Sequence, residues 1–181
     1  RFVKEDGVEL SSKIYLFQGL PKSDKMELII QKAVELGVYE VVPVAAKRSV
    51  VKLDAKKEGA KLARWQGIAE AAAKQSRRRV VPQIHPVMTM KEAAAYASGM
   101  DVGLIPYELA EGMGKTKELV SSLHGGQSVA VFIGPEGGFE ESEIGLAREA
   151  GIEPVTMGRR ILRTETAGLT MLSWIMYQLE N

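Results

Sequence analysis

Short apolar runs alternate with helical patterns along almost the whole chain, and this alternation limits the fold more than any other feature of the sequence. The runs that predict buried strands lie at 14–17, 41–44, 82–87, 102–105, 129–133 and 154–157. The helical patterns lie at 24–36, 53–76, 90–97, 116–123, 142–150 and 166–179. Strands separated by helices form βαβ units, whose strands run parallel. We therefore predict an α/β domain with a mainly parallel sheet flanked by helices.

The sequence contains no cysteine and two histidines, His85 and His124. The lack of cysteine excludes disulfides, thiolate metal ligands and thiol nucleophiles. It also excludes the usual methylation of carbon 5 of a pyrimidine, in which a cysteine thiolate adds to carbon 6. The two histidines lie far apart in the sequence with no acidic ligand motif beside either, so we predict no metal site.

The chain has 181 residues, of which 45% are hydrophobic and 26% charged, as is usual for a globular domain. Its longest apolar runs are too short to cross a bilayer, and no charged segment followed by an apolar one opens the chain. We therefore expect a cytoplasmic protein that makes no membrane contact. Because the chain begins with Arg1 rather than Met, we also expect it to be part of a longer protein.

The net charge of +1 conceals two regions of opposite sign, a strongly basic segment at 47–79 and an acidic one at 101–153. The basic segment predicts either a surface for a nucleic-acid phosphate backbone or an ordinary solvated helix face. Charge alone does not decide between these interpretations.

Ligands of parallel α/β sheets bind beyond the carboxyl ends of the strands. Three segments of the sequence are predicted to lie there, at 105–108, 134–138 and 158–163. We therefore expect the functional site among these three loops.

The segment 109–116 reads L-A-E-G-M-G-K-T and resembles a phosphate-binding P-loop at every position except the first. Leu109 replaces the first glycine of that motif, and Glu108 and Glu111 would place negative charge beside the phosphates. The strand at 129–133 also lacks the aspartate that such proteins use to bind magnesium. We therefore favour an ordinary loop and helix start over a nucleotide triphosphatase.

Two motifs follow the last two predicted strands. In the segment 134–138, G-P-E-G-G, the glycines allow close approach of the backbone to a ligand, and the proline stiffens the turn. That motif alone is also typical of a tight strand-to-helix turn. The segment 157–167, M-G-R-R-I-L-R-T-E-T-A, then places three arginines and a glutamate just before an apolar helix. Helix capping and solvation do not explain why Arg163 and Glu165 lie so close to a buried helix.

Together, G-P-E-G-G and G-x-R-I-L-R-T-E-T-A resemble the motifs of the RsmE family, uridine-N3 methyltransferases of 16S ribosomal RNA in the SPOUT superfamily. The similarity continues upstream in Lys25-Met26-Glu27, the segment 32–37, Pro43, Arg48-Ser49, Glu70-Ala71 and Gln75-Ser76-Arg77. It covers nearly everything from Tyr15 to the C-terminus. The family often has leucine at the position of Met157, which is a mild change for an apolar pocket.

The resemblance implies a SPOUT-type α/β fold with a C-terminal trefoil knot, formed by residues 14–181. It implies S-adenosylmethionine as the cofactor, no metal, and methyl transfer to N3 of a uridine in the 16S RNA of the small ribosomal subunit. It also implies a homodimer, and an N-terminal PUA-like RNA-binding domain whose tail would be residues 1–13.

Given this resemblance, we expect Arg163 to stabilise the uracil anion, because a guanidinium is permanently charged and offers several donors. Glu165 would orient Arg163 or accept the proton of N3. The expected cofactor-binding residues are Ile105, Pro106, Ile133, Gly134, Pro135, Glu136, Gly138, Met157, Gly158, Ile161 and Leu162. The expected RNA-binding residues are Lys22, Lys25, Arg48, Arg77, Arg78, Arg79, Arg159 and Arg160.

Two other functions stay open at this point. The first is a SPOUT methyltransferase that acts on another RNA position, either a ribose 2′-hydroxyl or a tRNA base. The second is an RNA-binding module that has kept the fold without catalysis.

Overall fold

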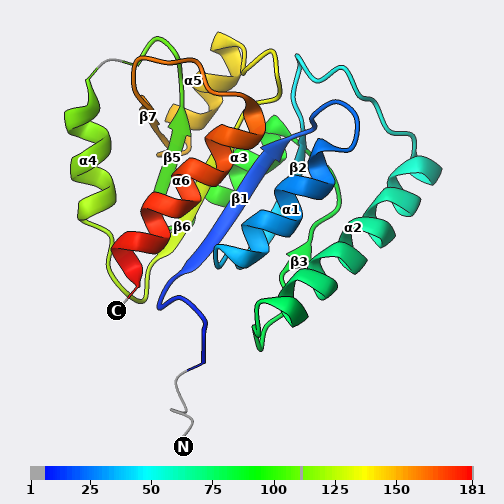
Figure 1. The fold of residues 1–181 in the computed structure, drawn as a ribbon. Helices are drawn as coiled ribbons and strands as arrows, with labels where there is room; N and C mark the ends of the chain where they lie inside the picture. Colours follow the sequence, from blue (N-terminus) through cyan, green and yellow to red (C-terminus); the bar gives the residue numbers. More distant parts are fainter. Residues whose placement is uncertain (1–6, 111, 181) are drawn as a thin grey trace, which may run out of the picture.

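A computed structural model describes residues 7–110 and 112–180 of the chain (Figure 1). Its strands are β1 (Lys13–Gly19), β2 (Glu40–Ala45), β3 (Gln83–Ile84), β4 (Met88–Thr89), β5 (Val102–Pro106), β6 (Ser128–Ile133) and β7 (Glu153–Val155). Its helices are α1 (Lys25–Glu35), α2 (Ala55–Gln75), α3 (Met90–Ala97), α4 (Met113–Ser121), α5 (Glu141–Glu149) and α6 (Thr164–Leu179).

The strands form one parallel sheet in the order β3-β2-β1-β6-β5-β7, with β4 also paired to β2. β1 and β6 lie at its centre, where Leu16 is in register with Val131 and both side chains are fully buried. This arrangement confirms the predicted α/β fold with a mainly parallel sheet. Because all the strands point the same way, the loops that follow them meet at one edge of the sheet, at the top in Figure 1.

Helices cover both faces of the sheet and give the domain three layers. On one face, α1, α2, α4 and α6 pack around Leu16, Val131 and their neighbours. On the other face, α3 and α5 pack around Phe17 and Phe132, whose rings stack with their centroids 4.3 Å apart. The sheet is therefore buried on both sides, which explains why its central strands read as continuous apolar runs rather than alternating ones.

Small differences separate the predicted elements from the observed ones. Of the segment predicted as one strand at 82–87, only β3 (Gln83–Ile84) forms a strand, since neither Pro82 nor Pro86 has an amide to donate, and the short strand β4 follows beyond it at Met88–Thr89. Helix α4 begins at Met113 instead of 116, directly after Gly112, which has a φ of 79°. In α6, Thr164 and Glu165 already belong to the helix. The start of α6 therefore lies inside the motif that the sequence singled out.

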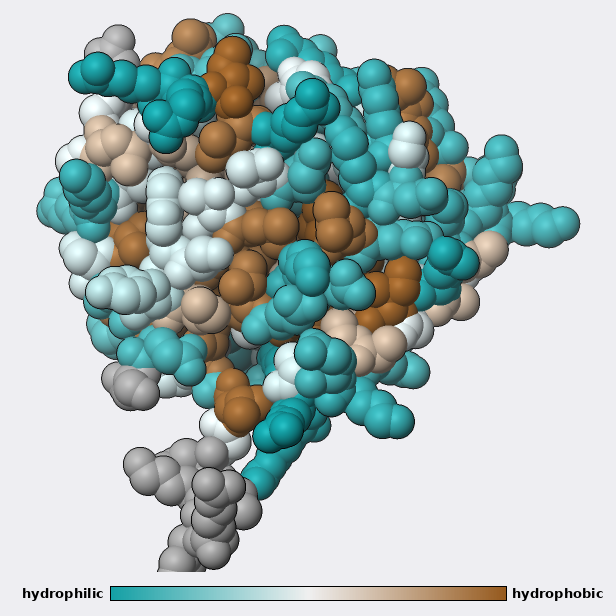
Figure 2. Space-filling view, viewed as in Figure 1, coloured by the Kyte–Doolittle hydropathy of each residue, from teal (hydrophilic) through white to brown (hydrophobic). Residues whose placement is uncertain are grey.

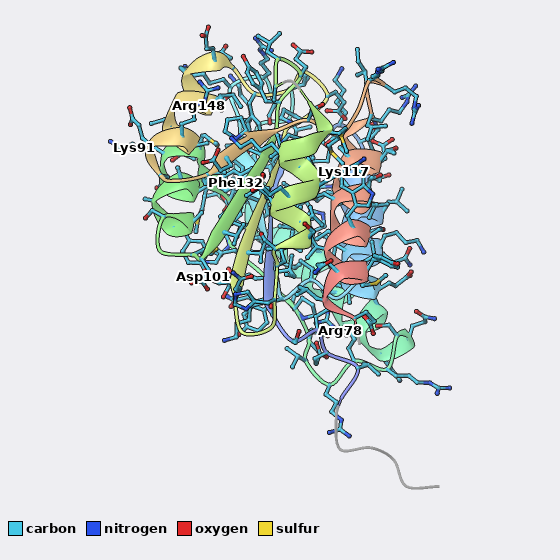
Figure 3. The ribbon with its side chains drawn as sticks, turned by 90° about the vertical axis from the view of Figure 1, so that its left-hand side faces the viewer. Arg78, Lys91, Asp101, Lys117, Phe132 and Arg148 are labelled. Atoms are coloured by element: carbon cyan, nitrogen blue, oxygen red, sulfur yellow. The ribbon has the colours of Figure 1, made fainter. Side chains whose placement is uncertain are left out.

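The side chain of Arg78 is built into the fold at the end of the molecule opposite the loops (Figure 3). It is 3% exposed, and its guanidinium donates to both carboxylate oxygens of Glu9. It also donates to the carbonyl oxygens of Val34, in the last turn of α1, at 3.0 Å and of Val38, beyond the helix, at 2.6 Å. These contacts correct the expectation that Arg78 binds RNA, because its donors are occupied within the protein.

Arg78→Met is expected to lower the free energy of unfolding by about 2–3 kcal/mol, less than the loss typical of a fully buried pair, because Glu9 is partly exposed. Burial alone would raise the pKa of the Glu9 carboxyl, but Arg78 and the amides of Val80 and Arg79 lower it. The pair therefore stabilises the fold fully above the unfolded pKa of Glu9, and this contribution disappears as the pH falls through the folded pKa. Urea denaturation should show a smaller acid-dependent loss of stability for the variant than for the wild type. If Arg78→Met changes the free energy of unfolding by less than about 0.5 kcal/mol at neutral pH, the contacts of Arg78 do not stabilise the fold.

Two predictions, the PUA-domain tail and the trefoil knot, stay untested. The predicted PUA-domain tail at 1–13 lies partly outside the described residues, and the trefoil knot stays a prediction. Within the ranges 7–110 and 112–180, no helix combines the length and apolar character needed to span a membrane.

Candidate active site

The loops at the carboxyl ends of β5, β6 and β7 surround a cavity of about 470 Å³. These are the three segments among which the sequence placed the functional site. Most of the expected cofactor-binding residues line the cavity: Pro106, Ile133, Gly134, Pro135, Glu136, Gly138, Met157, Gly158, Ile161 and Leu162. Arg48, Arg159, Arg160, Arg163 and Lys25 also line it, so charged side chains surround an interior that is partly apolar.

The structure differs from the expected site at three residues. Ile105 is fully buried in the core beneath α3 and α5 and does not line the cavity, because side chains alternate along β5 and Pro106 is the residue that faces it. Ile161 lies at the cavity but is 93% exposed, so it forms part of the rim and not an apolar wall. Glu165 does not line the cavity, and its carboxylate faces Lys25 instead.

The cavity has further lining residues that were not among the expected binding residues, which are Tyr107, Glu108, Gly137, Phe139, Thr156, Thr164 and Ala167. Tyr107 and Glu108 belong to the predicted loop at 105–108, and Gly137 belongs to the loop at 134–138. Thr156 directly follows β7, so the rule that ligands bind beyond strand ends would have found it as well. Phe139 gave no such signal, since an apolar residue before a helix is more often part of the core.

The glycines of the 134–138 loop are required by close contacts. A Cβ on Gly134 would lie 3.0 Å from the Cα of Gly138, and a Cβ on Gly19 would lie 2.5 Å from the Cδ of Pro135. Gly138 has a φ of 71°, a conformation that residues with a side chain rarely adopt. The backbone of the loop therefore lies directly against β1 and against itself, with no room for larger residues.

Two consecutive hydrogen bonds join β1, the first turn of α6 and the 134–138 loop. Gln18, at the end of β1, is fully buried, and its Nε2 donates to the Thr164 hydroxyl oxygen at 2.9 Å. Thr164 in turn donates to the carbonyl oxygen of Gly134 at 2.7 Å. A buried polar chain of this kind holds its members in one arrangement, because breaking it leaves polar atoms without partners. It fixes the first turn of α6 against the 134–138 loop.

Lys25, at the start of α1, lies between two carboxylates on one wall of the cavity. Its Nζ is 3.3 Å from Glu136 Oε1 and 3.7 Å from Glu165 Oε2. Burial alone would raise the pKa of the Glu136 carboxyl, but hydrogen bonds from the Lys22 amide, from its own amide and from Lys25 lower it below its ordinary value. Glu136 is therefore an ionised acceptor at neutral pH and not a strong base.

The expected RNA-binding residues divide into two groups in space. Arg48, Arg159 and Arg160 are exposed at the cavity, and the Arg48 guanidinium donates to the carbonyl oxygen of Gly137 at 3.0 Å. Lys22 is exposed next to them and reaches Glu136 through its amide. The exposed Arg77 and Arg79 flank Arg78 in the sequence, and Figure 3 shows Arg78 at the end of the molecule opposite the strand-end loops.

The segment that resembles a P-loop serves to hold the site in place. Thr116 is buried, and its hydroxyl donates to the carbonyl oxygen of Thr156 at 2.7 Å. Lys115 forms an ion pair with Glu153. Both side chains are thus held by β7 and the residue after it. This arrangement agrees with the helix start that the sequence favoured over a nucleotide triphosphatase.

Comparisons with known proteins cover most of this chain. A profile of the RNA methyltransferase domain matches residues 8–176. The ribosomal RNA small subunit methyltransferase E of Bacillus subtilis is 43% identical, over 95% of this chain and 68% of that protein. The protein of the same name from Mesomycoplasma hyopneumoniae is 36% identical, over 91% of this chain and 70% of that protein. The chain belongs to the RsmE family of RNA methyltransferases.

Solved structures agree with membership of the RsmE family. A ribosomal RNA small subunit methyltransferase E from Neisseria gonorrhoeae, bound to S-adenosyl methionine, has a TM-score of 0.82 at 36% identity, over 93% of this chain and 68% of that one. The crystal structure of a hypothetical protein has a TM-score of 0.90 at 42% identity, over 98% of this chain and 70% of that one. The family inferred from the two sequence motifs is therefore confirmed.

Proposed function

We propose that this chain is the catalytic domain of an S-adenosylmethionine-dependent enzyme that methylates N3 of a uridine in 16S ribosomal RNA. The observation that carries the proposal is the cavity between the 134–138 and 158–163 loops, in a fold shared with the cofactor-bound Neisseria protein. A volume of about 470 Å³ lies within the range of about 300–1,000 Å³ that is usual for cofactor sites.

The residues present suit such a cofactor. Pro106, Ile133, Met157 and Leu162 offer an apolar wall for the adenine, and the glycine loops offer backbone donors and acceptors. When bound, the cofactor supplies an electrophilic methyl group on a sulfonium. Within 7–110 and 112–180, no three or more histidine and acidic side chains are grouped so that they could hold a metal ion.

The chain would contribute charge and shape to the reaction. N3 of uracil is mostly protonated at neutral pH, so its proton must leave for the nitrogen to attack the methyl carbon. Arg163 precedes the first turn of α6 and lines the cavity, where its guanidinium can stabilise the negative charge that develops on the base. Glu165, which faces Lys25, would act through that side chain and not on the base itself.

The proposed RNA surface surrounds the mouth of the cavity. Arg48, Arg159, Arg160 and Lys22 would contact phosphates there and hold the target nucleotide over the cofactor. Arg77 and Arg79 flank Arg78, which lies at the end of the molecule opposite these loops, so they would contact RNA or a preceding PUA-like domain away from the target base.

Nucleoside mapping tests the proposal directly. Ribosomal RNA from cells that lack the protein should lose one N3-methyluridine, and complementation should restore it. A lost ribose methyl group or a lost tRNA modification would instead support a SPOUT enzyme with another target. An unchanged set of modified nucleosides would support a non-catalytic RNA-binding module.

We also propose that the active unit is a homodimer that pairs through the outer side of α6. This helix buries Met171, Leu172, Ile175 and Leu179 inside its own domain. Leu169 and Met176, which lie two turns apart on its other side, are only partly buried, and Tyr177 is 85% exposed. Figure 2 shows apolar surface gathered over the central part of this face of the molecule. A symmetric pair would cover it.

Met176→Glu should therefore convert the protein from a dimer to a monomer at micromolar concentration, since a buried unpaired charge is costly. Light scattering measures the change in mass, and methyl transfer should fall with it. Ala95→Glu, on the exposed side of α3 on the other face, is the matched control and should stay dimeric. A wild type that is monomeric and fully active would contradict the proposal.

A further inference from the structure

Three charged side chains from separate elements meet on one wall of the cavity, and we call them the Lys25 cluster. Lys25 begins α1, Glu136 belongs to the loop after β6, and Glu165 lies in the first turn of α6. Lys25 and Glu136 line the cavity, whereas Glu165 lies behind Lys25 and does not. Lys25 is therefore the member that presents a positive charge to a ligand.

The Lys25 cluster is incomplete in the protein alone. Charge-assisted hydrogen bonds are usually about 2.7–2.9 Å long, and Lys25 Nζ lies 3.3 Å and 3.7 Å from its two partners. Its ammonium has three donors, of which one makes a hydrogen bond to the described residues, to Glu136. Glu165 Oε2 is closed to solvent and accepts no hydrogen bond from the described part of the chain. Within that part of the chain, Glu165 Oε2 therefore faces only the Lys25 ammonium, at 3.7 Å, and two of the three Lys25 donors are free to meet an acceptor in the cavity.

The charges of the cluster decide which ligand group fits. One ammonium and two carboxylates leave a net negative charge. A phosphate, or the carboxylate of the cofactor, would bring a full negative charge next to Glu136 and Glu165 as it approached Lys25. A uracil carbonyl oxygen is neutral when it binds and later carries only part of the delocalised charge of the base, so it meets less of that repulsion. This argues against the expectation that Lys25 binds the RNA backbone.

We propose that Lys25 is a catalytic residue whose ammonium donates to a carbonyl oxygen of the target uracil, and that Glu165 is the positioning residue that holds it. This inference rests on the proposed function. The two carbonyl groups of uracil that flank N3 share the negative charge left when the N3 proton passes to solvent water. Donation from Lys25 therefore strengthens as that charge develops, which is the requirement for lowering the barrier.

The reaction balances without any further reactant. The lone pair of N3 forms a bond to the methyl carbon, the carbon–sulfur bond breaks, and its electron pair stays on sulfur as a neutral thioether. Lys25 neither gains nor loses a proton. Arg163 and Lys25 then act together, since the anion has two oxygen atoms to stabilise and the cavity offers a cation from α1 and another from the start of α6.

Lys25→Met is expected to reduce kcat about 100-fold at saturating cofactor and small ribosomal subunits, as for the loss of one preorganised donor. The dissociation constant of S-adenosylmethionine should stay within about threefold. The double variant Lys25→Met/Glu165→Gln keeps the net charge of the wild-type cluster and should be no more active than the single variant. Lys32→Met removes another α1 lysine, paired with Glu35 away from the cavity, and serves as the control.

The pH profile provides a readout that a purely structural role would not change. A nearby ammonium lowers the pKa of N3–H in the bound uracil. Without it that pKa rises, so the rate of Lys25→Met should continue to increase at alkaline pH values where the wild-type rate has levelled off. An unchanged profile would overturn the proposal.

Two other results would also overturn it. If cofactor affinity falls while kcat at saturation is unchanged, Lys25 binds the cofactor. If RNA affinity and its salt dependence fall while kcat is unchanged, Lys25 contacts phosphate. A wild type that produces no N3-methyluridine would refute the proposed function before any variant is compared, so the two failures are distinguishable.

Discussion

Gly134→Val is expected to weaken binding of S-adenosylmethionine at least about 100-fold, or about 2.7 kcal/mol, while the domain stays folded. A Cβ at this position would lie 3.0 Å from Gly138 Cα and 3.2 Å from the Phe139 amide nitrogen. These neighbours are backbone atoms that cannot move aside as a flexible side chain would. The two extra methyl groups of valine would therefore displace the 134–138 loop that forms one wall of the cavity. Calorimetry with purified protein measures the loss.

Gly145→Val is the matched control, because a Cβ on Gly145 in α5 would meet nothing within 4 Å. That variant should bind the cofactor as the wild type does. Gly134→Ala, which adds the Cβ alone, should fall between the two. If Gly134→Val binds with unchanged affinity, the cofactor does not occupy this cavity.

Arg163→Ala is expected to reduce kcat about 100-fold or more while the dissociation constant of the cofactor changes only a few-fold. Arg163 lies at the N-cap of α6, with its side chain at the cavity, so its backbone is fixed by the helix that follows. Its proposed contribution is made in the transition state, when negative charge appears on the uracil, and hardly at all in the cofactor complex. Single-turnover kinetics at saturating RNA separates the two effects.

Arg148→Ala tests whether the loss of any exposed arginine would reduce kcat as Arg163→Ala does. Arg148 is an exposed residue in the last turn of α5 (Figure 3), and its replacement should leave turnover unchanged. Arg163→Lys, which keeps the charge but loses the planar fork, should retain part of the activity. If Arg163→Ala lowers cofactor affinity in parallel and turnover at saturation is normal, Arg163 is a binding residue.

The fold was predictable because its signals are local. Buried parallel strands are short, apolar and β-branched, and the helices between them carry a clear repeat, so each element could be placed within a few residues. The exception was the segment at 82–87, of which only Gln83–Ile84 forms a strand, while β4 lies beyond it at Met88–Thr89. A strand of two residues is too short to show an apolar pattern. β3 and β4 are strands only because they pair with β2.

The site was predictable in its loops but not in the direction of every side chain. The strand-end rule and the family motifs placed Gly134, Met157 and Arg163 at the cavity. They also placed Ile105 at the cavity, whereas it lies in the core. The face of the sheet on which a residue lies depends on the register of its strand, and the motifs do not determine that register. They also grouped Arg78 with its neighbours, since a run of arginines does not reveal which one folds back onto Glu9.

The hydrogen bonds from Gln18 to Thr164 and from Thr164 to Gly134 join distant parts of the chain at the cavity. Gln18 and Thr164 are 146 residues apart in the chain. Because Thr164 holds the carbonyl oxygen of Gly134, the wall of the cavity is complete only when α6 is docked against the sheet. A ligand that binds against this wall would therefore stabilise only molecules in which α6 is docked, and would oppose the detachment of this helix.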